Sequence, residues 1–143
     1  MHKNVIISVV DGQGGGIGKN IVSKLRKLIS KELGVTICAL GTNSTATNNM
    51  IKSGADIGAT GENAIIQTAA KSNVIIGSIA IIAANSMHGE LTPNMALAIS
   101  SSDAYKVLIP LNRCKIIIPI EQNRTTDSYI ESGVKMALDF INS

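Results

Sequence analysis

The segment VIISVVDGQGGGIGK, residues 5–19, decides the fold class of this 143-residue chain. It opens with a nearly continuous β-branched run, Val5–Val10, which is typical of a strand buried on both faces. A glycine-rich turn follows at Gly12–Gly18, and an amphipathic helix is expected from Ile17 to about Leu33, with Gly34 as its C-terminal stop. This order of strand, glycine turn and helix indicates the first βα unit of a parallel sheet.

Strands and helices alternate along the rest of the chain. Further strands are expected at Val35–Leu40, Val74–Ile76, Lys106–Leu111 and Lys115–Ile120. Helices are expected from Ser44 or Thr45 to Ser53, at Glu62–Lys71, from a Thr92 cap with Pro93 to Ser101, and from Thr126 or Asp127 onward. The alternation predicts a single α/β domain over residues 1–143, a three-layer Rossmann-like sandwich with its first strand central in a mostly parallel sheet.

Three segments complete this prediction. Ala55–Gly61 is expected to be a loop, and Ile79–Ala84 fits either a strand extension or a buried helix. Only Asn112-Arg113-Cys114 separates the last two strands, which is too short for a crossover helix. The end of the sheet is therefore expected to be an antiparallel hairpin.

Composition excludes several classes of protein. Aromatic residues make up only 2% of the chain, so a base-stacking platform is not expected. A net charge of +3 is too small for the basic patch of a nucleic-acid binder. The longest apolar stretch, Val74–Ala84, is too short to cross a membrane. Cys38 and Cys114 lack the spacing of a zinc site or disulfide scaffold, so we expect a cytoplasmic protein without a metal.

Because Val74–Ala84 is long for a monomer of this size, we expect a homodimer.

The glycine turn is expected to bind an anion. Glycines let backbone N–H groups point into one space, and a helix N-terminus adds a positive dipole end. A plain strand-to-helix turn needs one or two glycines, whereas five of the seven positions are glycine here: Gly12, Gly14, Gly15, Gly16 and Gly18, with Gln13 and Ile17 between them. We therefore expect the amides of Gly14–Gly18 to hold a phosphate and Lys19 to neutralise its charge.

The glycine spacing narrows the choice of ligand. The G-x-x-x-G-x-G pattern of Gly12, Gly16 and Gly18 resembles the turn of short-chain dehydrogenases, but no Tyr lies four residues before a Lys. A Walker A motif fails at Gln13 and Asn20, so a divergent P-loop NTPase is a less favoured alternative. The expected ligand is a phosphate-bearing small molecule, a nucleotide or dinucleotide such as NAD(P) or an adenine nucleotide.

Polar residues follow other strands of the expected sheet. Gly41, Thr42 and Asn43 end the second strand at the edge where open α/β sheets bind ligands. Thr60 and Asn63 lie in the turn at the start of the helix expected at Glu62–Lys71, and this turn either faces the opposite edge or bends inward. We expect these residues to contact the sugar or base, with Asp11 either holding a ribose hydroxyl or capping the glycine turn.

Catalysis stays undecided at this point. The candidate acids and bases are Glu62, His88 and Glu90, which lie in loops or in a first helical turn, and no Ser-His-Asp or Cys-His set can be assembled. The alternative is a ligand-sensing or partner-binding module that carries out no reaction.

Four longer strings give the chain a family resemblance. It resembles small uncharacterised bacterial proteins classed only as a domain of unknown function. The matching strings are Val10–Gly18, Ala39–Asn43, Gly54–Asp56 with Gly58–Ala64, and Asn85–Met87 with Gly89-Glu90. The resemblance implies a Rossmann-like domain and implies no activity.

Overall fold

A computed structural model of the chain describes residues 4–30, 34–111, 115–120 and 123–143. The strands are β1 (Val5–Asp11), β2 (Val35–Gly41), β3 (Ile57–Thr60), β4 (Val74–Ser78) and β5 (Tyr105–Ile109). The helices are α1 (Gly16–Leu28), α2 (Ser44–Lys52), α3 (Glu62–Ala69), α4 (Pro93–Ser101) and α5 (Thr126–Asn142), with a short 3-10 helix η1 (Ile79–Ile82) after β4.

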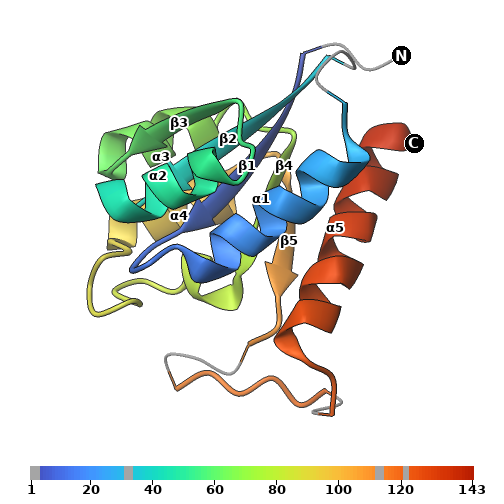
Figure 1. The fold of residues 1–143 in the computed structure, drawn as a ribbon. Coiled ribbons are helices and arrows are strands. Elements are labelled where there is room, and N and C mark those ends of the chain that lie inside the picture. The colour runs from blue at the N-terminus through green and yellow to red at the C-terminus, as the bar shows by residue number, and fades with distance from the viewer. Residues whose placement is uncertain (1–3, 31–33, 112–114, 121–122) are drawn as a thin grey trace.

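The five strands form one parallel sheet in the order β3-β2-β1-β4-β5 (Figure 1). The predicted α/β class and the central position of the first strand are confirmed, and the order is consistent with a Rossmann-like sandwich. From β1 the chain builds the sheet outward through β2 and β3, then returns to add β4 and β5 on the other side of β1. The direction of winding therefore reverses between β1 and β4.

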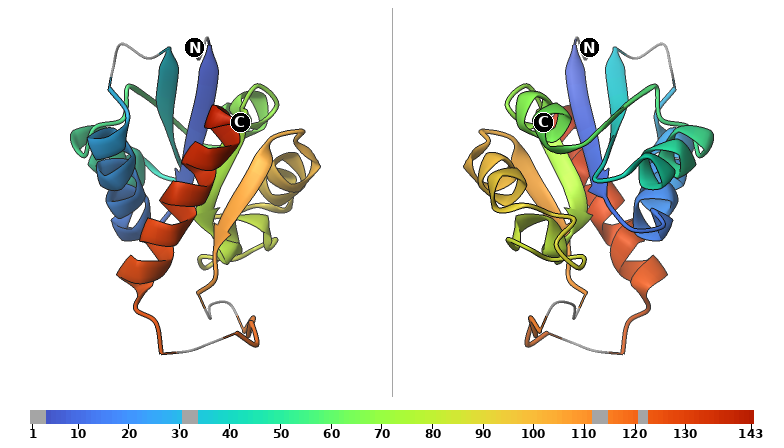
Figure 2. Two further views of the ribbon diagram at one scale, coloured as in Figure 1. Left: turned by 90° about the vertical axis from the view of Figure 1, so that its right-hand side faces the viewer. Right: turned by 90° about the vertical axis from the view of Figure 1, so that its left-hand side faces the viewer.

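Helices cover both faces of the sheet (Figure 2). Ile21 and Leu25 of α1, Met50 of α2 and Val134 of α5 pack in one cluster with the β1 side chains Ile7 and Val9. Side chains of α3, α4 and η1 form a second cluster on the opposite face, with Val10, Leu40 and Ile75. Burial on both faces explains why β1 reads as a nearly continuous apolar run.

Helix starts follow the capping rules. The Thr92 hydroxyl accepts a hydrogen bond from the Met95 amide at 3.2 Å with Pro93 as the next residue, as the sequence predicts. The N-cap of α2 is Asn43 rather than Ser44 or Thr45, because its Oδ1 accepts from the Ala46 amide at 2.8 Å. Helix α1 ends at Leu28, while its expected end at Leu33 lies outside the described residues.

The prediction of an antiparallel hairpin at the C-terminal end of the sheet is wrong. β5 pairs with β4 in parallel, and residues 115–120 form no strand. Pro110 directly follows β5 and Pro119 lies inside the second expected strand, and a proline has no N–H to donate to a ladder. The Ile120 amide instead bonds the Ile118 carbonyl at 2.8 Å, which is a tight local turn. The expected turn at Asn112-Arg113-Cys114 lies outside the described residues.

Two further segments differ from or complete the prediction. The expected loop Ala55–Gly61 contains the edge strand β3, a four-residue strand of mostly small residues. Because β3 is parallel to β2, its carboxyl end brings Thr60 to the same edge as Asp11 and Gly41. Ile79–Ala84, left open between strand and helix, contains η1, whose start is capped by the Ser78 hydroxyl accepting from the Ala80 amide at 3.2 Å.

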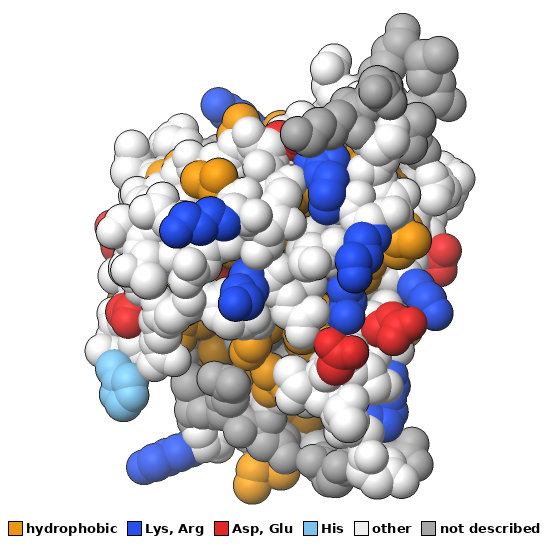
Figure 3. Space-filling model, in the orientation of Figure 1, with side chains coloured by type: hydrophobic (Ala, Val, Ile, Leu, Met, Phe, Trp, Pro, Cys, Tyr) orange, Lys and Arg blue, Asp and Glu red, His pale blue; other side chains and the backbone are white. Residues whose placement is uncertain are grey.

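The surface and the apolar stretch Val74–Ala84 concern contacts with membranes, nucleic acids and a second copy of the chain. Within the described residues, no helix combines the length and the hydrophobicity needed to span a bilayer. Lysine and arginine side chains are spread over the face formed by α1 and α2 rather than gathered in one patch (Figure 3). Most of the Val74–Ala84 stretch is buried in the core of its own chain. The homodimer therefore stays a prediction without support from that stretch.

Candidate functional site

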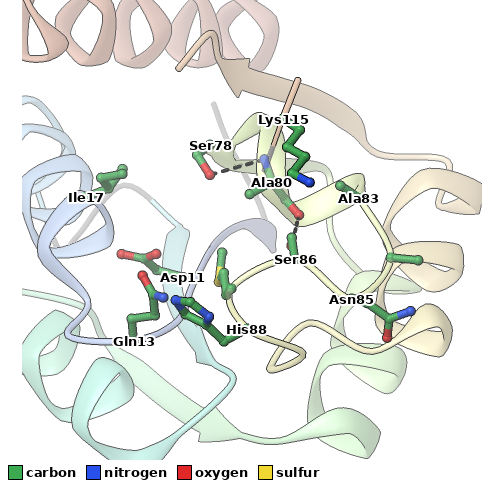
Figure 4. Close-up of a pocket in the computed structure, with 12 residues that line it drawn as sticks. Asp11, Gln13, Ile17, Ser78, Ala80, Ala83, Asn85, Ser86, His88 and Lys115 are labelled. Atoms are coloured by element: carbon green, nitrogen blue, oxygen red, sulfur yellow. Dashed lines mark hydrogen bonds between the residues drawn. The ribbon is translucent and has the colours of Figure 1, made fainter. Parts of the chain in front are cut away.

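A cavity of about 640 Å³ opens at the carboxyl ends of β1 and β4 (Figure 4). This is the place where the winding of the sheet reverses, and open α/β sheets bind their ligands at such a place. The cavity is lined by Asp11, Gln13, Ile17, Ser78, Ala80, Ala83, Ala84, Asn85, Ser86, Met87, His88 and Lys115. Of the residues that the sequence assigned to ligand binding, Asp11, Gln13 and Ile17 belong to this lining.

Asp11 closes the glycine turn from inside. It ends β1, is 7% exposed, and its two carboxylate oxygens accept from the amides of Gly12 at 2.8 Å and Gly18 at 2.7 Å. Gly18 is in the first turn of α1, so the carboxylate also lies at the positive end of the helix dipole. Of the two roles that the sequence left open for Asp11, these bonds support the capping role.

Glu90 holds the turn from outside. A single oxygen, Oε1, accepts from the Gln13 amide at 2.9 Å, the Thr42 hydroxyl at 2.7 Å and Asn43 Nδ2 at 2.8 Å. The bond from Gln13, with that from Thr42 next, holds the pKa of Glu90 below its ordinary value. Glu90 is therefore ionised at neutral pH and serves as a clamp between three loops, a role that the sequence did not predict.

These contacts divide the amides of the turn into two groups. Four amides are occupied. Those of Gly12 and Gly18 donate to Asp11, that of Gln13 donates to Glu90, and that of Gly15 donates to the Gly12 carbonyl. The open amides are those of Gly14, Gly16 and Ile17, for which the described residues provide no hydrogen-bond acceptor. The expectation that all amides of Gly14–Gly18 face a ligand is therefore too broad, because Gly15 and Gly18 are already bonded.

Packing, not anion binding, explains three of the five glycines in the turn. A Cβ at Gly12 would lie 2.5 Å from the Thr42 hydroxyl oxygen, and one at Gly18 would lie 2.5 Å from the sulfur of Met50. Gly15 has a φ of +73° and its Cβ would lie 2.9 Å from Ala46 Cα. A Cβ at Gly14 or Gly16 would meet nothing within 4 Å, so the space above these two residues is open.

The polar residues after β2 and β3 do not line the cavity. Thr42 and Asn43 donate to Glu90, and Asn43 also donates to the Gln13 carbonyl at 2.9 Å. The Thr60 hydroxyl lies 2.7 Å from that of Thr47. Gly41 allows α2 to approach, since a Cβ there would meet the Thr47 hydroxyl oxygen. Asn63 is exposed in the first turn of α3, and Lys19 is exposed in the first turn of α1.

The cavity wall contains an unusual share of left-handed backbone. Gln13, Asn85, Met87, His88 and Lys115 have φ values between 52° and 65°, and Asn4 is the one other non-glycine residue with positive φ among those described. Such conformations cost about 1–3 kcal/mol each and cluster at functional sites. Sequence reasoning missed Lys115, which it placed in a strand, and no signal in the sequence brings Lys115 to this edge.

The three predicted acid–base candidates have different surroundings. Glu62 joins the starts of two helices, because its carboxylate accepts from the Thr92 hydroxyl at 2.5 Å and Asn94 Nδ2 at 3.4 Å. His88 lines the cavity, where its ring lies with the side chains of Asp11 and Gln13 (Figure 4). The described residues contain no group of three His, Cys, Asp or Glu side chains placed for a metal.

Cys38 is the free cysteine among the described residues. It lies in β2 and is 2% exposed. Burial raises the pKa of its thiol to about 11, which keeps it protonated at neutral pH. It is a packing residue of the second core cluster.

Comparison with known proteins gives a family and no activity. The family described as "Domain of unknown function (DUF3842)" matches residues 6–142, nearly the whole chain. This confirms the resemblance to a domain of unknown function drawn from the four sequence strings. No curated protein matches the chain.

Proposed function

The chain belongs to the family of the domain of unknown function DUF3842, and we propose that it binds a phosphate-bearing small molecule in the cavity between β1 and β4. The phosphate lies over the open amides, and the remainder of the molecule, a nucleoside in the best-fitting case, extends along the cavity. The observation that carries this proposal is a large cavity beside the start of α1, where three amides have no acceptor among the described residues and one of their residues, Ile17, lines the cavity.

Position and size support the proposal. The cavity of about 640 Å³ is within the range of about 300–1,000 Å³ that is usual for small-molecule sites. Ile17, which carries one of the open amides, lines it, and so does Gln13, which directly precedes the open amide of Gly14. A second hollow of about 360 Å³ lies at the opposite edge of the sheet, near Tyr105 and Phe140, where ligands of this architecture do not usually bind.

The charges around the open amides attract an anion, and two carboxylates reduce this attraction. The open amides and the dipole of α1 attract negative charge. Lys115 adds a cation to the cavity lining, and Lys19 is exposed in the first turn of α1. Asp11 and Glu90 bring two carboxylates, which reduce the net attraction. A phosphate over Gly14 and Gly16 is favoured because the open space there lets it bond the amides directly, at about 1.5–3 kcal/mol for each charge-assisted bond.

The cavity lining suits a nucleoside. Ile17, Ala80 and Ala83 give an apolar wall, and Ser78 and Gln13 supply polar groups. NAD(P) and adenine nucleotides are therefore the first ligands to test. The P-loop alternative is less favoured, because Asn20 donates to Asp127 of α5 at 3.1 Å and offers no hydroxyl for magnesium.

Binding without catalysis is the second candidate function. Two of the three acid–base candidates, Glu62 and Glu90, are bonded to their own protein through threonine hydroxyls. In each of them a carboxylate oxygen is already occupied by a hydroxyl of the protein. A sensing or partner-binding module therefore fits the described residues as well as an enzyme does.

A thermal-shift panel of adenine, guanine, nicotinamide and flavin nucleotides tests the proposal. A hundredfold excess over Kd stabilises a protein by about 2.7 kcal/mol. Gly16→Asp adds a carboxylate beside the open amides, where the described space is free, and we expect it to lower the affinity about tenfold while the helix remains folded.

The matched control is Thr126→Asp, which adds the same charge at the first residue of α5, where Thr126 is exposed. Its affinity should equal that of the wild type. Absence of stabilisation by every nucleotide and by inorganic phosphate, or equal losses in the two variants, would contradict the proposal.

A further inference from the structure

The loop over residues 83–91 forms one wall of the cavity and is folded largely on itself. Asn85 and Leu91 bond each other, with the Asn85 amide 2.7 Å from the Leu91 carbonyl, and the Leu91 amide bonds the Ser86 carbonyl at 3.2 Å. Leu91 is fully buried, and the Ser86 hydroxyl donates to the Ala80 carbonyl at 2.6 Å. The loop therefore has two firm anchors of its own, Ser86 and Leu91.

Between these anchors, side-chain hydrogen bonds to the rest of the protein come from one residue. Among the described contacts of residues 87–90, only Glu90 bonds by its side chain, to Gln13, Thr42 and Asn43. Met87 and His88 have left-handed backbone, with φ of 57° and 55°. Apart from the packing of Met87 against the second core cluster, the Glu90 side chain is what holds this strained tip to the neighbouring loops, so the tip can move without unfolding its anchors.

The partners of Glu90 form a defined site for a negatively charged oxygen. Three donors from two loops converge on the single atom Oε1 at 2.7–2.9 Å. Asn43 is fixed for this task, because its Oδ1 caps α2 through the Ala46 amide while its Nδ2 faces Glu90. The Glu90 carboxylate fills this site in the present structure.

We propose that the backbone amide of Gln13, the hydroxyl of Thr42 and the side-chain amide of Asn43 form a second anion subsite. When a ligand with two linked phosphates binds, one phosphate displaces the Glu90 carboxylate from this subsite. This inference rests on the proposed function, since the first phosphate occupies the open amides. It specifies the ligand class as a diphosphate, of a nucleotide or a dinucleotide. The open Gly14 amide follows directly after Gln13, so the two subsites are neighbours along the turn.

The exchange leaves no donor without a partner. A phosphate oxygen accepts the same three hydrogen bonds that Oε1 accepts, so the cost of an unsatisfied amide or hydroxyl is avoided. Glu90 is half-buried, and its carboxylate regains water when it leaves. Two anions cannot share three donors, so the ionised Glu90 competes directly with the second phosphate.

The test compares Glu90→Gln with Glu62→Gln by calorimetric titration of inorganic phosphate and inorganic pyrophosphate. Both changes remove one negative charge from a glutamate that is bonded to a threonine. Glu62 serves as the control because it is the first residue of α3 and bonds Thr92, before α4, instead of the glycine turn. We expect Glu90→Gln to bind pyrophosphate about tenfold more tightly than the wild type and to bind phosphate with nearly unchanged affinity. Glu62→Gln should leave both affinities unchanged.

A second variant removes one donor in place of the competitor. Thr42→Val keeps the side-chain shape, and we expect it to weaken pyrophosphate binding in the Glu90→Gln background and leave phosphate binding unchanged. Phosphate binding without any gain for pyrophosphate in Glu90→Gln overturns the second subsite alone. Absence of binding of either anion in every variant overturns the proposed function as well.

Discussion

The two groups of amides in the Gly12–Gly18 turn show what one segment can do for folding and for binding. The occupied amides bond Asp11, Glu90 and the Gly12 carbonyl and hold the turn to the sheet and to the neighbouring loops. The open amides of Gly14, Gly16 and Ile17 take no part in this. Acceptors of the protein itself therefore bond the occupied amides, and the open amides remain for a ligand.

Removing Asp11 should have the largest effect, because it breaks the structural half of the turn. Asp11→Ala leaves the amides of Gly12 and Gly18 without their acceptor at a site that is 7% exposed. We expect a loss of about 3 kcal/mol in the free energy of unfolding, measured in urea.

The control for Asp11 is Asp127→Asn, which changes an exposed carboxylate that also contacts α1, through Asn20. Its unfolding midpoint should stay close to that of the wild type. Equal midpoints for Asp11→Ala and Asp127→Asn would show that the buried carboxylate does not hold the turn.

A pair of alanine substitutions compares the two halves directly. Gly15→Ala forces a left-handed residue and brings a methyl group to 2.9 Å from Ala46 Cα, so we expect a loss of about 2 kcal/mol. Gly14→Ala meets open space and should be neutral or slightly stabilising. Thermal unfolding measures both, and similar losses in the two variants would argue against the division of the turn.

The pH dependence of the Glu90 contribution is the smallest expected effect. Hydrogen bonds from Gln13 and then Thr42 lower the pKa of Glu90 in the folded protein, so the unfolded chain takes up the proton first as pH falls. The stabilisation by Glu90 is therefore complete above its ordinary pKa of 4.5 and is lost progressively below that value. The difference in unfolding free energy between the wild type and Glu90→Gln, measured from pH 7 downward, should shrink below pH 4.5. A constant difference across this range would contradict the clamp.

Local signals in the sequence predict much of the fold. The β-branched run of β1, the Thr92-Pro93 cap and the apolar spacing of α1 and α5 each depend on residues within one or two turns. The antiparallel hairpin fails because Pro110 and Pro119, which have no N–H to donate, interrupt the apolar runs that indicate it. The strand β3 is missed because Ile57–Thr60 is short and owes its pairing to β2 and its packing to α2.

The site is only half predictable, because its contacts join distant residues. The glycine turn and Asp11 are local to β1, and sequence reasoning finds them. Glu90 lies 77 positions from Gln13, and no pattern in either segment indicates that they meet. The same is true of Lys115, which reaches the cavity through the path of the chain after β5.

The most direct measurement is a titration of the ¹⁵N-labelled protein with inorganic phosphate, followed by amide NMR. The open amides of Gly14, Gly16 and Ile17 should shift first and saturate together, while those of Gly12 and Gly18 stay nearly unchanged. Shifts confined to residues near surface lysines, or uniform changes that do not saturate, would contradict an anion site at the start of α1.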